Sequence, residues 1–404
     1  MFKFLKIFLS SILIICLFIT AVFGATVSSE CDLTDINVPI DTKVENAAIG
    51  QKLDIKAKSV ILMEPKTGTI LYESNSDEKL APASITKIMS LLLVMEAIDR
   101  QDITLETVVT ASEHACSMGG SQIWLEPNEA MTVHELLKAT VIASANDACV
   151  ALGELIAGSE EGFVALMNSR AKELGMTNTT FVNCTGLDAE GHLTSAHDVA
   201  VASSELIKHQ LIKDYSTVWM DTLRDGKSEL VNTNKLVRFY KGTTGLKTGT
   251  TSTAGYCLSA TAERGGMELV AVVMSGETSD ERFNGAKKLL DYGFANYNFF
   301  EIEADLEGNE TVPIKKGVMK GVGVTADGKL NLLLPKSEAK DITQKLNFKK
   351  DITAPIKKGD SVGECEVFVG EKSVGSINIV SKEDIERLNL WITFKWILNG
   401  LLTL

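Results

Sequence analysis

The stretch Ala81-Pro82-Ala83-Ser84-Ile85-Thr86-Lys87 decides how the rest of this 404-residue chain is interpreted. It opens an apolar run that predicts a helix. It also places a hydroxyl and an amine three residues apart, so Ser84 and Lys87 share one helix face. A serine becomes a nucleophile only when a base takes its proton, and a lysine can be that base if desolvation or another cation keeps it neutral. The spacing therefore suits acyl transfer.

Alone, this S-x-x-K spacing means little, because Ser169 to Lys172 and Ser337 to Lys340 repeat it and an isolated match usually marks a solvated helix face. Two later motifs give it weight. Ser144-Ala145-Asn146 lies in a predicted helical segment, and Lys247-Thr248-Gly249 opens a predicted strand. An S-x-N and a K-T-G in this order complete the signature of β-lactam-reactive serine enzymes.

A second K-T-G and a second S-x-N are not expected to be site residues. Lys66-Thr67-Gly68 belongs to a turn rich in proline and glycine, which joins the predicted strands Ser59 to Met63 and Thr69 to Glu73 into a hairpin. Ser376-Ile377-Asn378 falls in a later region of short strands. A polar exposed turn and a strand are adequate explanations for these two matches.

The order of predicted elements indicates an α/β protein of the α+β kind, with an antiparallel sheet flanked by helices. From Glu301 to about Val380 the pattern changes to short alternating strands, which predicts a small, separate, sandwich-like β domain. The predicted helices cover Ser84 to Ile98, Thr132 to Ile142, Glu161 to Leu174 and Ala286 to Phe294, and further strands cover Thr253 to Ala262, Glu268 to Met274, Gly323 to Ala326, Leu330 to Leu334 and Ser376 to Val380.

The N-terminus has the pattern of a secretory signal peptide. Lys3 and Lys6 precede an apolar run from Ile7 to Phe23, and cleavage is expected after Gly24. An uncleaved anchor is the alternative, because an apolar run of this length can nearly span a bilayer. In either case the body of the protein is expected to be exported, at the outer face of the cytoplasmic membrane.

The C-terminal stretch, Ser381 to Leu404, predicts an amphipathic helix. Its apolar side includes Trp391 and Phe394, and it is too short for a membrane span, so we expect it to lie in the membrane interface. A helix docked onto the protein's own core is the alternative. The predicted organisation is a signal peptide over 1–24, a leader over 25–50, a catalytic domain over 51–298, the β domain over 299–380 and the tail helix over 381–404.

Charge and cysteine content exclude several functions. The formal net charge of −13 leaves no broad basic face for a phosphate backbone, so no nucleic-acid partner is expected. The seven cysteines include no C-x-x-C pair and lie near no histidine cluster, so a metal site is not expected. An exported chain can form disulfides, but buried single thiols are the simpler expectation. Nothing in the sequence implies a cofactor.

With its three motifs in this order, the chain resembles the D-alanyl-D-alanine carboxypeptidase family of low-molecular-mass penicillin-binding proteins. The likeness covers about Ala57 to Phe294, including fragments at Asn183 to Gly186, Thr194 to Val199 and Arg282 to Phe294. It implies a β-lactamase/transpeptidase-like catalytic domain, and the later β domain and tail also resemble the family's C-terminal arrangement. The implied partners are peptidoglycan stem peptides as substrates, β-lactams as inhibitors and the membrane surface.

The resemblance implies a role for each motif residue. Ser84 would attack the carbonyl between two terminal D-alanines while neutral Lys87 accepts its proton. Ser144 and Lys247 would relay that proton to the departing D-alanine, and the charge of Lys247 would keep Lys87 unprotonated. Asn146 would orient Lys87 and the substrate amide.

The same resemblance implies how the substrate is held. The backbone N–H groups of Ser84 and Thr250 would form the oxyanion hole. Thr248, Thr250 and Arg282 are the candidates for the substrate carboxylate, although Arg282 could also be an ordinary surface residue at a helix N-terminus. The implied substrate-binding set is Lys247, Thr248, Gly249, Thr250 and Arg282.

Three alternatives remain. A serine β-lactamase would share two motifs, but the middle residue of the S-x-N motif is Ala145 rather than aspartate, and no E-x-x-L-N segment is present to hold a deacylating water. A transpeptidase or endopeptidase would differ only in the acyl acceptor or the bond cleaved. A catalytically silent wall-binding protein would have no need for all three motifs. The five histidines, His114, His134, His192, His197 and His209, match no catalytic pattern and are expected to be structural or exposed.

Overall fold

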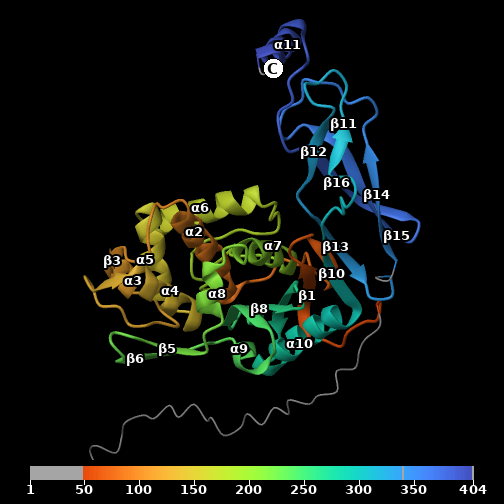
Figure 1. Ribbon diagram of the computed structural model, residues 1–404. Coiled ribbons are helices and arrows are strands. Elements are labelled where there is room, and N and C mark those ends of the chain that lie inside the picture. The colour runs from red at the N-terminus through yellow and green to blue at the C-terminus, as the bar shows by residue number, and fades with distance from the viewer. Residues whose placement is uncertain (1–48, 339–340, 403–404) are drawn as a thin grey trace, which may run out of the picture. The chain divides into compact units, whose positions relative to one another are not determined.

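The computed structural model describes residues 49–338 and 341–402. The predicted signal peptide and the predicted leader up to residue 48 lie outside the described residues, as does the lysine of the pair Ser337 to Lys340. Residues 49–296 combine helices with an antiparallel sheet, and a region of strands follows them (Figure 1). The predicted α+β class is therefore confirmed.

A five-stranded antiparallel sheet with the strand order β2-β1-β9-β8-β7 forms the centre of the first part. Its first two strands form the predicted hairpin, in which Val60 lies opposite Ser74. In the turn between them, the Thr67 N–H donates to the Glu64 carboxylate at 2.7 Å, so this K-T-G has a turn role as predicted. The strands are β1 (Ala57–Glu64), β2 (Thr69–Ser74), β7 (Thr243–Thr251), β8 (Gly255–Arg264) and β9 (Met267–Gly276).

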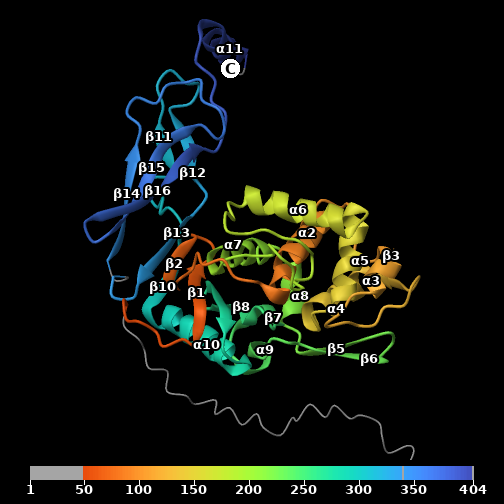
Figure 2. The ribbon, with the colours of Figure 1, turned by 180° about the vertical axis from the view of Figure 1, so that it is seen from behind.

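Strand β9 shows why the sheet is apolar on both faces. Leu269 and Val273 pack in the cluster that includes helix α10 (Ser279–Asn296), whereas Val270 and Val272 belong to the larger cluster of the helical layer. Alternate residues of a strand point to opposite faces, so a strand covered on both sides becomes a continuous apolar run. Each such side chain contributes about 1.5–3 kcal/mol relative to an exposed one. Figure 2 shows α10 on one face and helix α7 (Ala196–Leu206) on the other.

The helical layer is built around α2 (Lys87–Asp99), in which ten of thirteen residues are buried. The predicted helix from Thr132 is confirmed as α4, whose N-terminus has a capping box between Thr132 and Glu135. The predicted helix from Glu161 is confirmed as α6. The helices of this layer besides α2 and α7 are α3 (Glu113–Cys116), α4 (Val133–Ile142), α5 (Asn146–Ala157), α6 (Glu160–Glu173), α8 (Leu211–Ser216) and α9 (Leu236–Phe239). Two small two-stranded sheets pair β3 (Val108–Thr110) with β4 (Ala130–Thr132) and β5 (Met220–Leu223) with β6 (Ser228–Val231).

Two motifs lie in local structure that the sequence pattern did not predict. Ser84 belongs to a 3-10 turn, η2 (Ala83–Thr86), and α2 begins only at Lys87, because Ala83 enters the turn in the left-handed region at φ 49°. The predicted helix through Ser144 is wrong. The chain breaks between α4 and α5, with Ser144 at φ 63°. Apolar residues on both sides of this break extend the helical pattern across it and conceal it.

Three predicted boundaries are also wrong. Lys247 lies inside β7, which begins four residues earlier at Thr243. The closing helix α10 begins at Ser279, where the Thr278 side chain accepts the Glu281 N–H and supplies an N-cap. The tail helix α11 (Leu390–Leu402) begins nine residues after Ser381. In the first two cases the apolar pattern marks only part of the element, because polar residues form its first strand positions or its first turn. The predicted tail helix was instead too long, since the mostly polar residues 381–389 precede α11.

The second part is all β before the tail, as predicted. A five-stranded sheet of order β11-β12-β16-β15-β14 and the pair β10-β13 share a core that includes Val322, Cys365 and Ile379. Ser376-Ile377-Asn378 lies within β16, where Ile377 is buried in that core. The strands are β10 (Tyr297–Ile302), β11 (Thr311–Pro313), β12 (Gly321–Asp327), β13 (Leu330–Pro335), β14 (Ile342–Phe348), β15 (Ser361–Val369) and β16 (Lys372–Ser381).

The described part of the tail helix exposes large apolar side chains. Leu390 is 91% exposed, Trp391 64% and Phe394 54%, so this face does not pack on a core. Within residues 49–338 and 341–402, every helix is too short or too polar to cross a bilayer.

Candidate active site

The nucleophile turn lies between two glycines that come from distant parts of the chain. A Cβ added to Gly186, which has φ +90°, would lie 1.8 Å from the Ala83 carbonyl oxygen. A Cβ added to Gly249 would lie 2.9 Å from Ser84 N and 3.0 Å from Ile85 N. Only glycine permits backbone to approach this closely on both sides. The turn therefore holds Ser84, which is partly exposed, against β7.

Lys87 is fully buried, and its amine has three hydrogen-bond acceptors. Nζ donates to Asn146 Oδ1 at 2.5 Å, to the Thr185 carbonyl at 2.8 Å and to Ser84 Oγ at 3.1 Å. Burial lowers the pKa of Lys87 to about 8, while Cys149 and other neighbours act in the opposite direction. A lysine that loses its proton near pH 8, in contact with a serine hydroxyl, has the geometry of a general base.

Asn146 connects the general base to the loop before α5. It is the first residue of α5, and its Nδ2 donates to the Gly119 carbonyl at 2.6 Å while its Oδ1 accepts from Lys87. Its own N–H donates to the Ser121 carbonyl at 2.7 Å. Ser144, two residues earlier, is 4% exposed at the break between the helices. The structure therefore brings the predicted S-x-N asparagine onto Lys87.

Lys247 is the second buried amine. It is 1% exposed on β7, and its Nζ donates to the Thr248 carbonyl at 3.1 Å. Burial lowers its pKa well below the ordinary value, and the charges of Lys87 and Arg282 lower it further. Because two positive charges repel each other, a proton on one lysine lowers the pKa of the other. Lys247 was predicted to keep Lys87 neutral, whereas the pKa of Lys87 is lowered by the burial of Lys87 itself.

Arg282 is not a surface residue, so the surface interpretation of this position is wrong. It is 8% exposed in the first turn of α10, where its Nη1 donates to the Gly249 carbonyl at 3.0 Å and to Thr250 Oγ1 at 2.9 Å. Its Nε has no hydrogen-bond partner among the described residues. Burial lowers the pKa of the guanidinium, and it keeps its charge at neutral pH. A cation therefore lies beside Thr250.

Two functional contacts come from residues that the sequence did not single out. Thr185 contributes its backbone carbonyl to Lys87, and its neighbour Gly186 packs on the nucleophile turn. Thr248 Oγ1 donates to Thr233 Oγ1 at 2.6 Å, which fixes the K-T-G hydroxyl. The fragment Asn183 to Gly186 was noted only as a likeness to a family. The sequence of this fragment could not predict that the Thr185 carbonyl contacts Lys87, because every residue has a backbone carbonyl.

Asp147 fixes the loop that borders Asn146. Its buried carboxylate accepts the N–H groups of Ile123 and Leu125 at 3.0–3.2 Å, and these residues flank Trp124. Charge-assisted bonds of this kind are strong when buried. The residue after the S-x-N motif therefore fixes the loop whose Gly119 and Ser121 carbonyls accept from Asn146.

His192 and the cysteines are structural, as predicted. His192 Nδ1 accepts the Val182 N–H at 3.0 Å and Nε2 lies 2.8 Å from Thr86 Oγ1 in the nucleophile turn. Burial lowers the pKa of His192 to about 4, so the ring is neutral. In the described part of the chain the cysteines are free thiols, and all but Cys116 are buried. Cys16 and Cys31 lie outside the described residues.

A cavity of about 350 Å³ opens beside the nucleophile turn. Its walls include Pro82 and Ala83 on one side and residues 186–190 on the other. The cavity therefore borders the residues that precede Ser84, and Ser84 itself does not line it. No cluster of His, Cys, Asp or Glu in residues 49–338 and 341–402 is arranged to hold a metal ion.

Two sequence families match this chain. Residues 44–278 match the family described as D-alanyl-D-alanine carboxypeptidase, and residues 300–387 match the C-terminal domain of penicillin-binding protein 5. The D-alanyl-D-alanine carboxypeptidase DacF of Bacillus subtilis is 45% identical over 343 residues, which cover 84% of this chain and 88% of that protein.

Solved structures give the same result. Penicillin-binding protein 5 of Haemophilus influenzae superposes with a TM-score of 0.71 at 30% identity, covering 83% of this chain and 99% of that one. Penicillin-binding protein D2 of Listeria monocytogenes, solved in its ampicillin-bound form, has a TM-score of 0.55 at 32% identity. That match covers 60% of this chain and 100% of the Listeria protein.

Proposed function

Because the chain belongs to the D-alanyl-D-alanine carboxypeptidase family and has the activity of that family, we propose that it removes the terminal D-alanine of peptidoglycan stem peptides through an acyl-enzyme on Ser84. The observation that carries this assignment is the contact of 3.1 Å between Ser84 Oγ and the amine of Lys87. A buried amine with a lowered pKa can take the serine proton at mildly alkaline pH.

Acylation begins when Ser84 Oγ attacks the carbonyl carbon between the two D-alanines and its proton passes to Lys87. The carbonyl oxygen becomes an oxyanion, which accepts the N–H groups of Ser84 and Thr250. Gly249 supports this geometry, because its missing side chain lets β7 approach Ser84 N closely. The intermediate then collapses to an ester on Ser84 as the peptide C–N bond breaks.

The departing D-alanine needs a proton on its nitrogen, and Ser144 and Lys247 supply the route from Lys87 to it. Its carboxylate binds at Thr248, Thr250 and Arg282, since Arg282 Nη1 donates to Thr250 Oγ1 at 2.9 Å and so places a positive charge beside that hydroxyl. Water then attacks the ester with Lys87 again as the base, which releases the shortened peptide and restores Ser84.

β-Lactams react at the same serine in this proposal. The relative from Listeria was solved with ampicillin bound, and a β-lactam offers a strained amide to a nucleophile that already attacks an amide. When the ring C–N bond breaks, the nitrogen stays attached to the acyl group through the rest of the opened ring. No fragment leaves the site, so the ester persists and blocks the enzyme. Covalent labelling by penicillin is therefore a direct assay of the acylation step.

The assay for the whole reaction is release of D-alanine from diacetyl-L-Lys-D-Ala-D-Ala. Release together with penicillin labelling supports the proposal. Labelling without release keeps the acyl-enzyme but assigns the protein to transpeptidation or endopeptidation. Rapid turnover of penicillin itself would instead assign it to the β-lactamases.

The rate should depend on pH with an acidic limb near pH 8. The pKa of Lys87 is lowered to about 8, so the amine is neutral above this pH and protonated below it. Only the neutral amine accepts a proton, and kcat/KM should fall about tenfold per pH unit on the acidic side. The measurement is D-alanine release from pH 6 to 10. A rate that is flat down to pH 6 would contradict the assignment of Lys87 as the base.

We also propose that α11 attaches the exported protein to the outer face of the cytoplasmic membrane. The exposure of Leu390, Trp391 and Phe394 supports this, because such a face gains free energy by entering the lipid interface. The full-length protein should sediment with vesicles of phosphatidylethanolamine and phosphatidylglycerol, and a chain ending at Asn389 should not. D-alanine release in solution should be equal for both. Equal sedimentation of both would contradict the proposal.

A further inference from the structure

The general base is held by a short segment, Cys184-Thr185, that contributes backbone atoms to the site. The Thr185 carbonyl accepts from Lys87 Nζ at 2.8 Å. The Cys184 carbonyl accepts from Ser90 Oγ at 2.7 Å, and Ser90 lies one turn after Lys87 on α2. The two carbonyl groups of this segment therefore lie along α2. The Cys184 carbonyl accepts from Ser90 in its first turn, and the Thr185 carbonyl accepts from the amine of Lys87.

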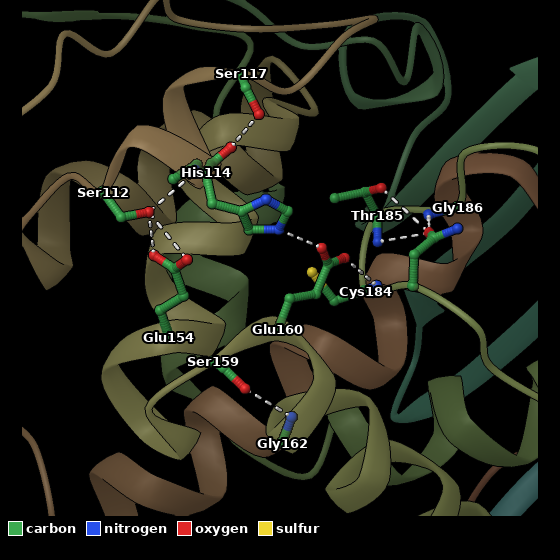
Figure 3. A network of polar contacts seen from close by, with 12 residues as sticks. Ser112, His114, Ser117, Glu154, Ser159, Glu160, Gly162, Cys184, Thr185 and Gly186 are labelled. Atoms are coloured by element: carbon green, nitrogen blue, oxygen red, sulfur yellow. Dashed lines mark hydrogen bonds and ion pairs between the residues drawn. The ribbon is translucent and has the colours of Figure 1, made fainter.

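The N–H groups of the same segment are fixed from elsewhere. Asn183 Oδ1 accepts the Thr185 N–H at 3.2 Å and the Gly186 N–H at 2.7 Å. Glu160 Oε1 accepts the Cys184 N–H at 3.1 Å. Figure 3 shows the Glu160 side chain reaching from α6 toward Cys184, with Thr185 and Gly186 beyond it.

Glu160 is itself held in one orientation. Its side chain is 13% exposed, and Oε2 lies 2.7 Å from His114 Nε2 (Figure 3). It is the first residue of α6, where Ser159 caps the helix and the helix dipole favours a carboxylate. Both of its oxygens therefore have a partner, one on α3 and one on the segment that holds Lys87.

We infer that Glu160 is a positioning residue for the general base. Its hydrogen bond to the Cys184 N–H places the Thr185 carbonyl, and that carbonyl places the amine of Lys87 against Ser84 Oγ. This role rests on the proposed function of Lys87 as the base. Glu160 acts through the backbone of residues 184 and 185 and is not proposed to contact the substrate.

The energetic reason is that Cys184 is fully buried. Without an acceptor its N–H would remain unpaired, which costs about 1–3 kcal/mol, so the peptide group would turn toward another partner. Such a turn would shift the backbone of residues 183–185 and, through it, displace the Thr185 carbonyl from Lys87. A displacement of about 1 Å at a catalytic group can reduce the rate about 100-fold.

Two substitutions separate the hydrogen bond from the charge. Glu160→Gln removes the charge but keeps a side-chain oxygen at the same distance from the Cys184 N–H. Glu160→Asp keeps the charge, but its side chain is one methylene shorter, so its oxygens lie farther from that N–H. We expect the glutamine variant to acylate with labelled penicillin within about 3-fold of the wild type and the aspartate variant to be about 10- to 100-fold slower. KM for the peptide should change little in both, because Glu160 does not face the substrate.

The pH profile of acylation is the readout that a purely structural role would not change. The Thr185 carbonyl favours the charged form of Lys87, so its displacement in Glu160→Asp should move the acidic limb to lower pH. The other ionisable groups near Glu160 and Lys87 are His114, Cys149, Cys184, Asp147 and Lys247, and all are unchanged in these variants.

The matched control is Glu161→Asp, because Glu161 is the next residue of the same helix turn and is exposed. It should acylate like the wild type. An aspartate variant at position 160 as fast as the wild type, or a glutamine variant as slow as the aspartate one, would overturn the inference. A wild-type protein that acylates normally in that experiment leaves the proposed function intact, whereas one that never acylates contradicts the proposed function itself.

Discussion

Replacing Ser84 with alanine is expected to abolish both D-alanine release and covalent labelling by penicillin, a loss of at least about 10⁴-fold. The hydroxyl is the atom that forms the ester, and no other serine contacts the amine of Lys87 in the described residues. Substrate binding should survive, because the groups proposed to bind the carboxylate are on β7 and α10. The measurements are D-alanine release and gel detection of labelled penicillin on equal amounts of folded protein.

The matched control for this variant is Ser169→Ala. Ser169 has the same S-x-x-K spacing, but it is exposed on α6, so its loss should leave the rate unchanged. Both variants should unfold within a few degrees of the wild type, because neither side chain fills the core. Covalent labelling of the Ser84→Ala protein at the wild-type rate would refute the assignment of the nucleophile.

Replacing Lys87 with methionine is expected to slow acylation by about 10³-fold or more, because the hydroxyl of Ser84 loses the amine that hydrogen-bonds to it. Methionine has a similar length and fills the same space. It leaves the acceptors on Asn146 and Thr185 without their donor, a cost that is offset because a buried amine with a lowered pKa no longer needs to be desolvated. Acylation should fall far more than stability.

The measurement is the acylation rate constant with labelled penicillin, together with the midpoint of thermal unfolding. Lys172→Met is the control, since Lys172 is the exposed lysine of the second S-x-x-K pair. The remaining activity of Lys87→Met should lose the acidic limb near pH 8. If that limb persisted unchanged, another group would be the base.

The chemistry of this site could be predicted from the sequence because it is carried by side chains with a fixed order. Ser84, Lys87, Asn146 and Lys247 are recognisable residue types at recognisable spacings, and the structure brings Ser84, Lys87 and Asn146 together. The hairpin and the helices from Thr132 and Glu161 were also predicted, since their turn and capping signals are local.

What the sequence could not predict depends on contacts between distant segments. The Thr185 carbonyl is a backbone group, and the Glu160 carboxylate contacts the backbone N–H of Cys184. Backbone groups are the same in every residue, so the sequence does not indicate these two contacts. The break at Ser144 is concealed because apolar residues continue on both sides. The burial of Arg282 results from packing against β7, and its position in a first helical turn indicates exposure instead.

The close approach of Gly249 to Ser84 sets the order in which this molecule can become reactive. About 165 residues separate the two, and at a synthesis rate of about 5–20 residues per second the serine exists for roughly ten to thirty seconds before its partner strand has been made. During that interval Ser84 and Lys87 have neither the proposed second donor of the oxyanion hole, the Thr250 N–H, nor the amine of Lys247, because both belong to β7. The unfinished chain therefore lacks part of the active site. The enzyme can react with amides only after β7 has joined the five-stranded sheet.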